Sequence, residues 1–488
     1  MMNGRRQSDG PILPKKPTNK APQAAEWAEG RGPTKGSSSE QNMCRTQSRG
    51  SVNNALGRIR QVSNKERGTR FTSLFHHIYS PEALLTAFYR LKRDAAPGVD
   101  GQTWNSYGAN LEENLLELSS RLKRGAYRPN PVRRVFIPKT DGTTRPIGIT
   151  TIEDKVVQNA TVAVLNAVYE PLFAGFSHGF RPGRGQHNAL DAVYVAITKK
   201  KVKWVLDADI RNFFDTINHE CLTRLIERKI QDPRVVRLVQ KWLKAGILSE
   251  ESRIEPEEGA PQGGSISPVL ANIYLHYAYD CWAVKWRKER AKGDAFFVRY
   301  ADDTVAGFQN YQEAQDFLMD MKRRFRDFKL ELHPEKTRIL QFGRFAASNR
   351  AERNEPKPET FDFLGLTHIC GKSRRGDFQL LRRTASKRMS RKLKEIKAEL
   401  RGRMHHRVSE TGQWLAAVLR GHYNYYGVPL NYRPLQTFHH RIVLLWLQTL
   451  RRRSQKSKLT WEKMDRLANR WLPKPRIAHP FPNKRLVV

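Results

Sequence analysis

The sequence predicts an α+β fold that ends, from about residue 377, in an all-helical region. Two stretches predict buried strands: apolar residues run over 204–208, and again over 296–308 on both sides of a tight acidic turn. A change in composition predicts the helical region, because beyond residue 377 apolar residues recur at helical spacing among many basic ones. The predicted parts are a disordered, basic extension at 1–65, a mixed region at 66–376 and a helical region at 377–488.

The charge of the chain indicates a polyanionic partner. Its 488 residues contain 87 Lys and Arg against 48 Asp and Glu, a net charge of +39 that exceeds what solubility requires. We expect nucleic acid rather than a membrane, since no apolar run approaches the roughly 20 residues that span a bilayer. Residues 1–6 lack the apolar core of a signal peptide. The four cysteines lie far apart without metal-ligand spacing, so we expect a reduced, cytoplasmic setting without zinc, in association with the nucleoid or a ribonucleoprotein.

The first part of the chain predicts an extension, a helix and a hairpin. Residues 1–65 are rich in Gly, Pro, Ser, Gln and basic residues, which indicates disorder and a surface suited to RNA. Apolar residues then recur at helical spacing around 84–91. Residues 132–149 predict a hairpin around a Thr-Asp-Gly-Thr turn. Lys139 and Arg145 flank that turn and can converge on phosphates, although basic residues on an exposed hairpin are more often simply solvated.

Two glycine-rich turns precede predicted helices. The loop at 178–185 is basic and leads into a helix near Asn188, whose N-terminus can bind backbone phosphate, although this pattern alone is a weak signal. The turn at 259–268 opens an amphipathic helix, and its glycines let backbone approach a ligand closely. Both turns are candidates for contacts with nucleotides.

Two adjacent aspartates, Asp302 and Asp303, interrupt the apolar residues of the 296–308 stretch. Taken alone, such a pair is more often a turn, because the Asp side chain hydrogen-bonds to nearby backbone. Between buried strands, however, neighbouring carboxylates repel each other and lose hydration, and a divalent cation relieves both costs. A third carboxylate is available at Asp209, where the other predicted strand ends, although acids at that position can also be capping or surface residues.

This set of acidic residues suits nucleotidyl transfer by two metal ions. That chemistry needs carboxylates that hold two cations roughly 3.5–4 Å apart, one at the attacking 3′ oxygen and one at the leaving pyrophosphate. Asp209 and Asp302 would bridge both ions, Asp303 would bind more peripherally, and Ile210 would contribute its backbone carbonyl. We expect two Mg²⁺ ions, because all these ligands are oxygens and the substrate brings phosphates, with Mn²⁺ as an alternative.

The region beyond residue 377 combines helical core patterns with basic surfaces. Apolar residues recur at helical spacing over 389–400 and basic residues fill the other positions, which suits a helix lying along a nucleic-acid backbone. The stretch 420–427 interleaves basic and aromatic residues, which can hold phosphates and stack on bases. The alternative is that its tyrosines belong to the core.

With these motifs in order, the chain resembles the reverse transcriptases encoded by bacterial group II introns. The Tyr-Ala-Asp-Asp turn at 300–303, together with the strand before Asp209, is similar to the palm of a reverse transcriptase. The likeness runs from about residue 70 to the end and implies a right-hand polymerase, with fingers and an antiparallel palm sheet followed by an α-helical thumb and maturase (X) domain. The other motifs are Pro-Gly-Val-Asp-Gly at 97–101, Ile-Pro-Lys…Arg-Pro-Ile-Gly-Ile at 137–149, His-Gly-Phe-Arg-Pro at 178–182, Ala-Pro-Gln-Gly-Gly…Ser-Pro at 260–268, Phe-Leu-Gly at 363–365 and Arg-Gly…Tyr-Tyr at 420–426.

The resemblance also implies roles for individual residues. Asp209, Asp302 and Asp303 would bind the catalytic metal ions. Phe214 would close against the sugar 2′ position and exclude ribonucleotides, and Lys336 would protonate the departing pyrophosphate. The other residues implied to contact the incoming nucleotide are Lys139, Arg145, Gln262 and Gly263. Those implied to contact RNA or primer are Arg181, Phe363, Gly365, Lys387, Arg391, Lys394, Arg420 and Tyr425.

The function implied by the resemblance is RNA-directed DNA polymerisation from dNTPs onto a primer 3′-OH, with binding of intron RNA to promote splicing and mobility. The expected partners are intron or template RNA, a DNA or RNA primer and dNTPs, without a membrane and with the oligomeric state left open. We expect the type without an endonuclease domain, because no Cys/His cluster follows residues 476–480. Two alternatives stay open: a stand-alone reverse transcriptase in phage defence or DNA repair, and an RNA-binding maturase with a vestigial polymerase.

Overall fold

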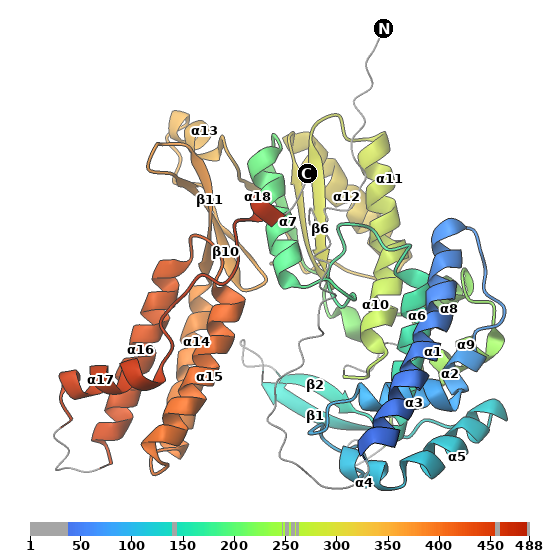
Figure 1. Cartoon of the computed structure of the whole chain (residues 1–488). Helices are drawn as coiled ribbons and strands as arrows, with labels where there is room; N and C mark the ends of the chain where they lie inside the picture. Colours follow the sequence, from blue (N-terminus) through green and yellow to red (C-terminus); the bar gives the residue numbers. More distant parts are fainter. Residues whose placement is uncertain are drawn as a thin grey trace.

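The fold is described from a computed structural model, which defines residues 38–138, 144–245, 247–248, 253–254, 259, 263–453 and 459–485. Figure 1 shows a block of helices with a small hairpin at lower right, a sheet flanked by helices at upper right, and a separate group of long helices on the left. We call these parts the fingers (38–169), the palm (170–345) and the thumb (386–472). This arrangement confirms the predicted fold class, an α+β region followed by helices.

The fingers begin with a long helix that the sequence did not predict. α1 (Ser38–Lys65) packs against α3 (Pro81–Tyr89) and α6 (Ile152–Tyr169), with Ile59 buried in the contact. The Ser63 hydroxyl donates to the carbonyl of Val168 at 2.6 Å. The prediction of disorder is therefore wrong for 38–65, because tertiary packing stabilises a helix that its polar composition would not. Residues 1–37 lie outside the described part of the chain. The other helices are α2 (His76–Tyr79), α4 (Trp104–Ala109) and α5 (Leu111–Lys123).

The predicted hairpin is present in the fingers. β1 (Val132–Pro138) and β2 (Thr144–Ile149) pair antiparallel, with Val135 opposite Ile147. β4 (Ile247–Leu248) joins β1 in parallel and pairs with β5 (Arg253–Ile254), which gives the order β2-β1-β4-β5. The turn between β1 and β2, at 139–143, lies outside the described residues.

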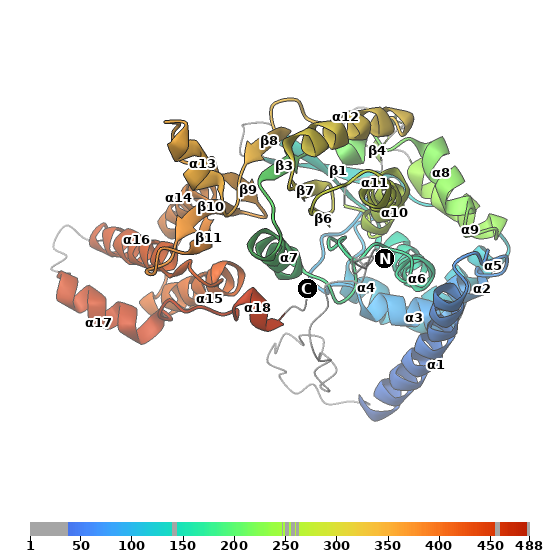
Figure 2. The same cartoon turned by 90° about the horizontal axis from the view of Figure 1, so that it is seen from above.

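The palm is an antiparallel sheet covered on both faces by helices (Figure 2). Its strands are β3 (Trp204–Ala208), β6 (Ala295–Tyr300), β7 (Asp303–Phe308) and β8 (Arg338–Gln341), in the order β6-β7-β3-β8. Phe297 belongs to the core under α10, α11 and α12, whereas its neighbours Phe296 and Val298 belong to the core under α7. Both faces are buried, which explains why these strands are apolar throughout. The covering helices are α7 (Gln186–Lys199), α10 (Ser267–Leu275), α11 (Cys281–Glu289) and α12 (Tyr311–Asp327).

A second sheet joins the palm to the thumb. Its strands are β9 (Phe361–Phe363), β10 (Leu366–Lys372) and β11 (Phe378–Thr384), in the order β11-β10-β9. The boundary predicted at 377 is therefore wrong, because a strand follows it and the helices begin only at Ser386. Arg382 disguised this strand, since a charged residue breaks its apolar pattern. Its side chain is nonetheless buried and pairs with Asp191 of α7 at 2.9 Å.

The thumb is a helical bundle with its own core, as predicted. Ile396 and Leu400 of the predicted helix are buried against Phe438 and Trp446. A last short helix leaves the bundle and packs on α7 of the palm, as Figure 2 shows. Of the helices in the described part of the chain, none is both long and apolar enough to cross a membrane. The thumb helices are α14 (Ser386–Gly402), α15 (Val408–Tyr426), α16 (Tyr432–Arg451) and α17 (Trp461–Trp471), followed by α18 (Pro482–Arg485). The remaining helices are α8 (His219–Glu227), α9 (Pro233–Leu243) and α13 (Ala346–Glu352).

Candidate active site

Three aspartates from neighbouring strands meet at one end of the palm sheet. Asp302 and Asp303 lie at the turn between β6 and β7. β3 pairs with β7 through Ala208 and Thr304, so the next residue of the chain, Asp209, lies beside Asp303. The structure therefore brings the third carboxylate to the acidic turn, as the sequence predicted.

The pKa of Asp303 shows how much negative charge this convergence concentrates. Burial raises the pKa of Asp303 to about 7, the carboxylates of Asp302, Asp209 and Asp207 add to the rise, and the Arg388 guanidinium opposes it. Asp303 is nevertheless the exposed first residue of β7, so water reaches it although protein surrounds it. At such a position, the Asp303 carboxyl group is more stable when it is protonated or bound to a cation than when it is ionised without a partner.

Lys336 brings a positive charge to the same place. Its Nζ lies 2.7 Å from Asp209 Oδ2. The segment 331–333 lies beside Asp209, because the His333 N–H donates to the Asp209 carbonyl at 2.8 Å and Ile210 forms an isolated antiparallel bridge with that segment. The hydrogen bonds of this bridge come from residues flanking Ile210, so the Ile210 carbonyl points away from 331–333.

The donor atoms of the three aspartates suit a hard divalent cation, since all are carboxylate oxygens. Across the described residues, however, no group of three or more His, Cys, Asp or Glu side chains is close enough to hold a metal ion. The ammonium of Lys336 instead balances one carboxylate of the set. A bound cation would therefore need Lys336 to move away from Asp209.

A buried arginine beneath the turn is a functional residue that the sequence analysis missed. Arg299 of β6 is fully buried and forms a bidentate ion pair with Asp280, with N–O distances of 2.6 and 2.7 Å. Its other N–H groups donate to the Ala301 carbonyl at 3.0 Å, the Asn272 side chain at 3.1 Å and the Ser177 hydroxyl at 2.8 Å. These bonds hold Ala301 at a left-handed φ of 57°, which is unfavourable for a residue with a Cβ. The available sequence signal was a single charge inside an apolar strand.

The glycine of the His-Gly-Phe-Arg-Pro motif packs directly on the catalytic turn. A Cβ at Gly179 would lie 2.3 Å from the backbone N of Ala301, so no other residue fits without moving the turn. The His178 N–H donates to the Arg299 carbonyl at 2.8 Å, and the Asn272 amide donates to the Gly179 carbonyl at 2.8 Å. His178 and Gly179 therefore support the turn that carries the aspartates.

Arg181 of the same motif does not face nucleic acid. Its side chain is 5% exposed and pairs with Glu170 at 2.8 Å. The guanidinium also donates to the carbonyls of Ala174 and Ser177, each at 2.7 Å. The prediction of an RNA contact is wrong, because a loop of the palm already uses the donors of this side chain.

Known proteins share this part of the chain. The family described as "Reverse transcriptase (RNA-dependent DNA polymerase)" matches residues 137–368, which contain the palm sheet and all three aspartates. Protein YkfC of Escherichia coli (strain K12) is 31% identical over 315 residues, or 58% of this chain and 79% of YkfC. Group II intron-encoded protein LtrA of Lactococcus lactis subsp. cremoris is 37% identical over 225 residues, or 45% of this chain. The chain belongs to the group II intron reverse transcriptase family.

The likeness to these reverse transcriptases covers different shares of each relative. The match spans only 37% of the length of LtrA. Nuclear intron maturase 4, mitochondrial, of Arabidopsis thaliana is 30% identical over 151 residues, which is 30% of this chain and 19% of that protein. The chain therefore spans well under half the length of these two relatives.

Phe214 and Gly263 were predicted to contact the incoming nucleotide, and the structure describes both. Phe214 is half-buried in the short helix after β3, with its ring centroid 5.4 Å from that of Phe213. Gly263 has a φ of 110°, and a Cβ there would lie 2.4 Å from the carbonyl oxygen of Gly148 on β2. Gly263 therefore packs against the fingers hairpin. Lys139, Gln262 and the side chain of Arg145 lie outside the described residues.

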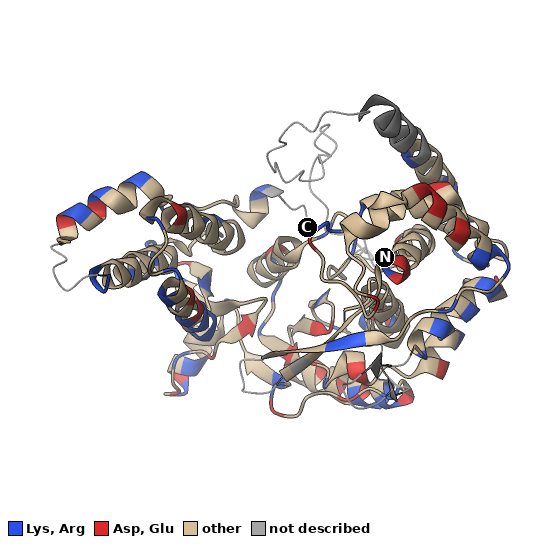
Figure 3. Cartoon of the chain, turned by 90° about the horizontal axis from the view of Figure 1, so that it is seen from below, with Lys and Arg blue, Asp and Glu red and all other residues tan. Residues whose placement is uncertain are grey.

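Most of the thumb residues predicted to contact RNA are exposed. Arg391 is also paired with Glu395 at 3.3 Å on the same helix. Tyr425 is half-buried, and its hydroxyl donates to the Leu364 carbonyl at 3.0 Å, which fixes the ring at the base of the thumb. Figure 3 shows Lys and Arg distributed over both the fingers and the thumb helices. The exposed basic residues are Lys387, Arg391 and Lys394 on α14 and Arg420 on α15.

The Phe-Leu-Gly turn packs inward instead of facing a primer. Phe363 is 3% exposed and belongs to the core beneath α7. Gly365 is buried, and a Cβ there would lie 3.1 Å from the Tyr426 hydroxyl and 3.4 Å from Cδ of Arg388. Phe363 was predicted to contact RNA or primer, but its side chain belongs to the core, and Gly365 lets the thumb approach β9 and β10 closely.

Proposed function

We propose that this chain is an RNA-directed DNA polymerase, which adds nucleotides from dNTPs to a primer 3′-OH on an RNA template. The observation that carries the proposal is the position of Asp209 beside Asp302 and Asp303 at the end of the palm sheet. Nucleotidyl transfer needs carboxylates in such a cluster to hold the cations that stabilise the attacking and leaving oxygens. The membership of the reverse transcriptase family supports the same reaction.

The proposed cofactor is Mg²⁺, held by the carboxylates of Asp209, Asp302 and Asp303 with the Ile210 carbonyl. Bound there, the metal would supply charge stabilisation to the reacting phosphate. Burial, together with repulsion from the neighbouring carboxylates, raises the pKa of Asp303 and supports this assignment, because a bound cation would offset both. Lys336 would turn from Asp209 toward the phosphates and give a proton to the departing pyrophosphate.

The residues around the turn have proposed roles in selecting the nucleotide. Phe214 would hinder a 2′-hydroxyl by its bulk. Gly263 would bring the backbone of its turn close to the template and incoming base. Lys139 and Arg145 would contact the triphosphate, and Gln262 would shape the base pocket.

The proposed partners are a template or intron RNA, a DNA or RNA primer and dNTPs, with association to a nucleoid or ribonucleoprotein. The printed names of LtrA and the Arabidopsis relative, an intron-encoded protein and an intron maturase, support an intron RNA. The exposed cations of α14 and α15 offer a surface for its backbone. Promotion of splicing would follow from this binding rather than from polymerisation.

A primer-extension experiment tests the proposal. A primed RNA template with dNTPs and Mg²⁺ should be extended by the wild type, and Asp302→Ala should lose about 10²–10³-fold in rate, as for a removed transition-state stabiliser. Asp465→Ala, on exposed α17, is the matched control and should extend normally. In the same assay Phe214→Ala should incorporate ribonucleotides more readily. Absence of extension by the wild type, or full activity of Asp302→Ala, would contradict the proposal.

The same variant separates polymerisation from the RNA role. Asp302→Ala should bind a group II intron RNA and support its splicing as the wild type does, because the thumb surface is unchanged. If Asp302→Ala loses both RNA binding and primer extension, the substitution instead disturbs the fold.

A further inference from the structure

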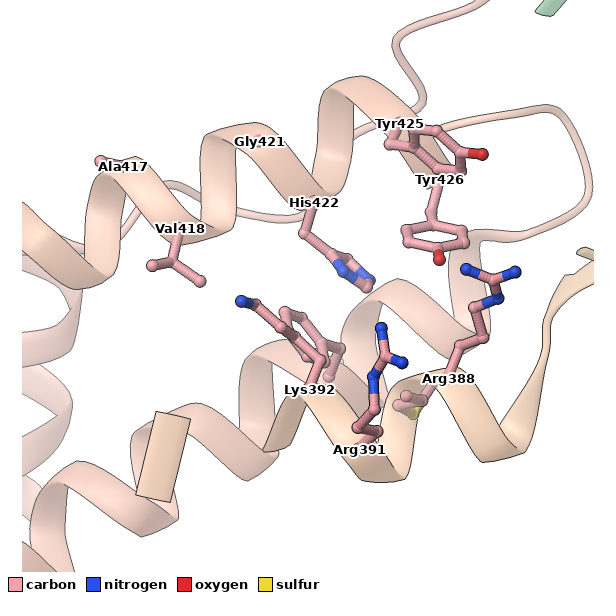
Figure 4. Close-up of a pocket in the computed structure, with 11 residues that line it drawn as sticks. Arg388, Arg391, Lys392, Ala417, Val418, Gly421, His422, Tyr425 and Tyr426 are labelled. Atoms are coloured by element: carbon pink, nitrogen blue, oxygen red, sulfur yellow. The ribbon is translucent and has the colours of Figure 1, made fainter. Parts of the chain in front are cut away.

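A cavity of about 360 Å³ lies in the thumb between α14 and α15. Figure 4 shows its two walls: Arg388, Arg391 and Lys392 extend from α14, while His422 and two tyrosines extend from α15. This volume lies within the range of roughly 300–1,000 Å³ that small-ligand sites occupy. Two of its lining residues, Arg391 and Tyr425, are among those predicted to contact RNA or primer, but neither the motifs nor the proposed catalytic centre predicts a defined nucleotide site here.

The α14 wall of this cavity is cationic. Arg388, Arg391 and Lys392 lie three and four positions apart, so they share one face of the helix. Arg391 and Lys392 both pair with Glu395, at 3.3 and 3.1 Å, which neutralises one charge of the three. In the described part of the chain, Arg388 has no carboxylate within 4.0 Å. The wall keeps a positive excess that an anion would balance.

The α15 wall is aromatic. The rings of Tyr425 and Tyr426 lie 4.7 Å apart, and His422 lies 4.6 Å from Tyr426 and is stacked on Phe438 at 3.6 Å. His422 is 8% exposed, and its buried Nε2 has no hydrogen-bond partner among the residues that the structure defines. Burial lowers its pKa to about 4, so the ring is neutral. Flat rings and an unused polar atom suit a planar heterocycle.

Gly421 keeps this cavity open. It lies inside α15, where glycine destabilises a helix relative to alanine. A Cβ at this position would meet no atom within 4 Å, so neighbouring packing does not require a glycine. The absence of a side chain instead preserves space between the two walls.

The cavity lies beside the Phe-Leu-Gly turn and within electrostatic reach of the aspartates. Arg388, on its cationic wall, acts on the pKa of Asp303, and Tyr425 is influenced by both Tyr300 and Asp303. The Tyr425 hydroxyl also donates to the Leu364 carbonyl at 3.0 Å. A strand whose 3′ end lies at the aspartates would therefore lie within the electrostatic influence of Arg388.

We propose that this cavity binds a single unpaired nucleotide of the nucleic acid held in the cleft. Its phosphate would lie against Arg388, Arg391 and Lys392, and its base against the aromatic wall of α15. A paired nucleotide would first have to leave its duplex, at a cost that an unpaired one does not have. The inference rests on the proposed nucleic-acid function and adds to it a nucleotide subsite outside the catalytic centre.

Fluorescent primer–template duplexes test this subsite. One RNA–DNA duplex is fully paired, and its relatives carry one unpaired 2-aminopurine nucleotide at successive positions of the primer strand near its 3′ end. The wild type should bind one of these relatives about 10-fold more tightly than the paired duplex and quench its fluorescence by stacking. Gly421→Leu, which fills the cavity, should abolish both the preference and the quenching. Gly402→Leu is the matched control, because Gly402 is the last residue of α14 and a Cβ there would meet no atom within 4 Å. This variant should keep both the preference and the quenching.

Each outcome decides the inference. Equal binding of paired and unpaired duplexes by the wild type, retention of the preference in Gly421→Leu, or its loss in Gly402→Leu would overturn it. If Gly421→Leu does not fold, Arg388→Gln replaces it, and an unchanged preference in that variant would overturn it equally. Extension of the fully paired primer by the wild type is measured alongside, so failure of the polymerase and failure of the subsite give different results.

Discussion

At the scale of single residues, the charge around Asp303 dominates the site. Its carboxylate lies near those of Asp302, Asp209 and Asp207. The positive charge of Arg388 opposes this negative charge, and Lys336 pairs with Asp209. The pKa of Asp207 is also raised, to about 6, mainly by burial, with Arg338 opposing the rise. Carboxylates this close together tend to stay protonated unless a bound cation takes the place of the protons.

The raised pKa of Asp303 predicts a pH-dependent response to Mg²⁺. A carboxyl with a folded-state pKa of about 7, above its ordinary value of 3.8, destabilises the metal-free protein as pH rises through that range. Cation binding needs the ionised form, so the increase in melting temperature caused by Mg²⁺ should be larger at about pH 8 than at about pH 6. Thermal unfolding with and without Mg²⁺ measures this increase.

The control for this response is Asp303→Asn, which removes the titrating carboxyl. In that variant the increase in melting temperature should depend much less on pH, while Asp465→Asn should behave as the wild type. A wild-type increase of equal size at both pH values would contradict the assignment of Asp303.

At the scale of secondary-structure elements, the β6–β7 hairpin depends on a buried polar cluster. Arg299 connects the hairpin to Asp280 and Asn272 of the helical layer, and to Ser177 in the loop before α7. Three side chains from two segments outside the hairpin therefore converge on one guanidinium. This cluster fixes the turn that carries the aspartates more firmly than the local sequence of the turn could.

Removal of Arg299 should strongly destabilise the protein. Arg299→Leu leaves the Asp280 carboxylate buried without its partner, a change that typically costs about 3–5 kcal/mol in the free energy of unfolding. Urea denaturation measures it. Arg323→Leu, which breaks an exposed pair with Asp320, should change stability by less than about 1 kcal/mol. A similarly small effect for Arg299→Leu would show that the cluster does not hold the turn.

At the scale of the whole molecule, the C-terminal segment links thumb to palm. After α17 the chain returns along the base of the thumb, where the Ala478 N–H donates to the Gly427 carbonyl at 2.8 Å. The His479 ring stacks on His187 of α7 with centroids 3.7 Å apart. The thumb, with its basic α14, is thereby held beside the palm as Figure 1 shows. Lys and Arg of the described residues are distributed over the fingers and the thumb instead of along a single helix.

This distribution predicts a steep salt dependence of RNA binding. If 6–10 phosphates are contacted, affinity should fall about 10³–10⁵-fold between roughly 50 and 200 mM salt. The logarithmic slope, from filter binding or anisotropy, should become smaller by about one for Lys394→Gln on α14. Lys285→Gln, on exposed α11, should leave the slope unchanged. A flat salt response of the wild type would exclude the basic helices as the RNA surface.

The sequence by itself determined the strands that end in aspartates, the fingers hairpin, the basic helix of the thumb and the membership of a polymerase architecture. These features are local or repeat at fixed spacing, so periodicity and motif order are sufficient to find them. It did not reveal the helix at 38–65, whose polar composition resembles a disordered segment, or β11, whose pattern is interrupted by Arg382.

Only the tertiary structure decided which polar residues belong to the interior. Arg181 and Phe363 were expected at nucleic acid and are buried, whereas Arg299 had no predicted role and supports the catalytic turn. The pairing of Lys336 with Asp209 likewise depends on segments far apart in the chain, and the cavity between α14 and α15 depends on how these two neighbouring helices pack. Whether a charged side chain binds a ligand or a buried partner depends on what the fold places within reach of it, because desolvating the charge is unfavourable unless a partner is present.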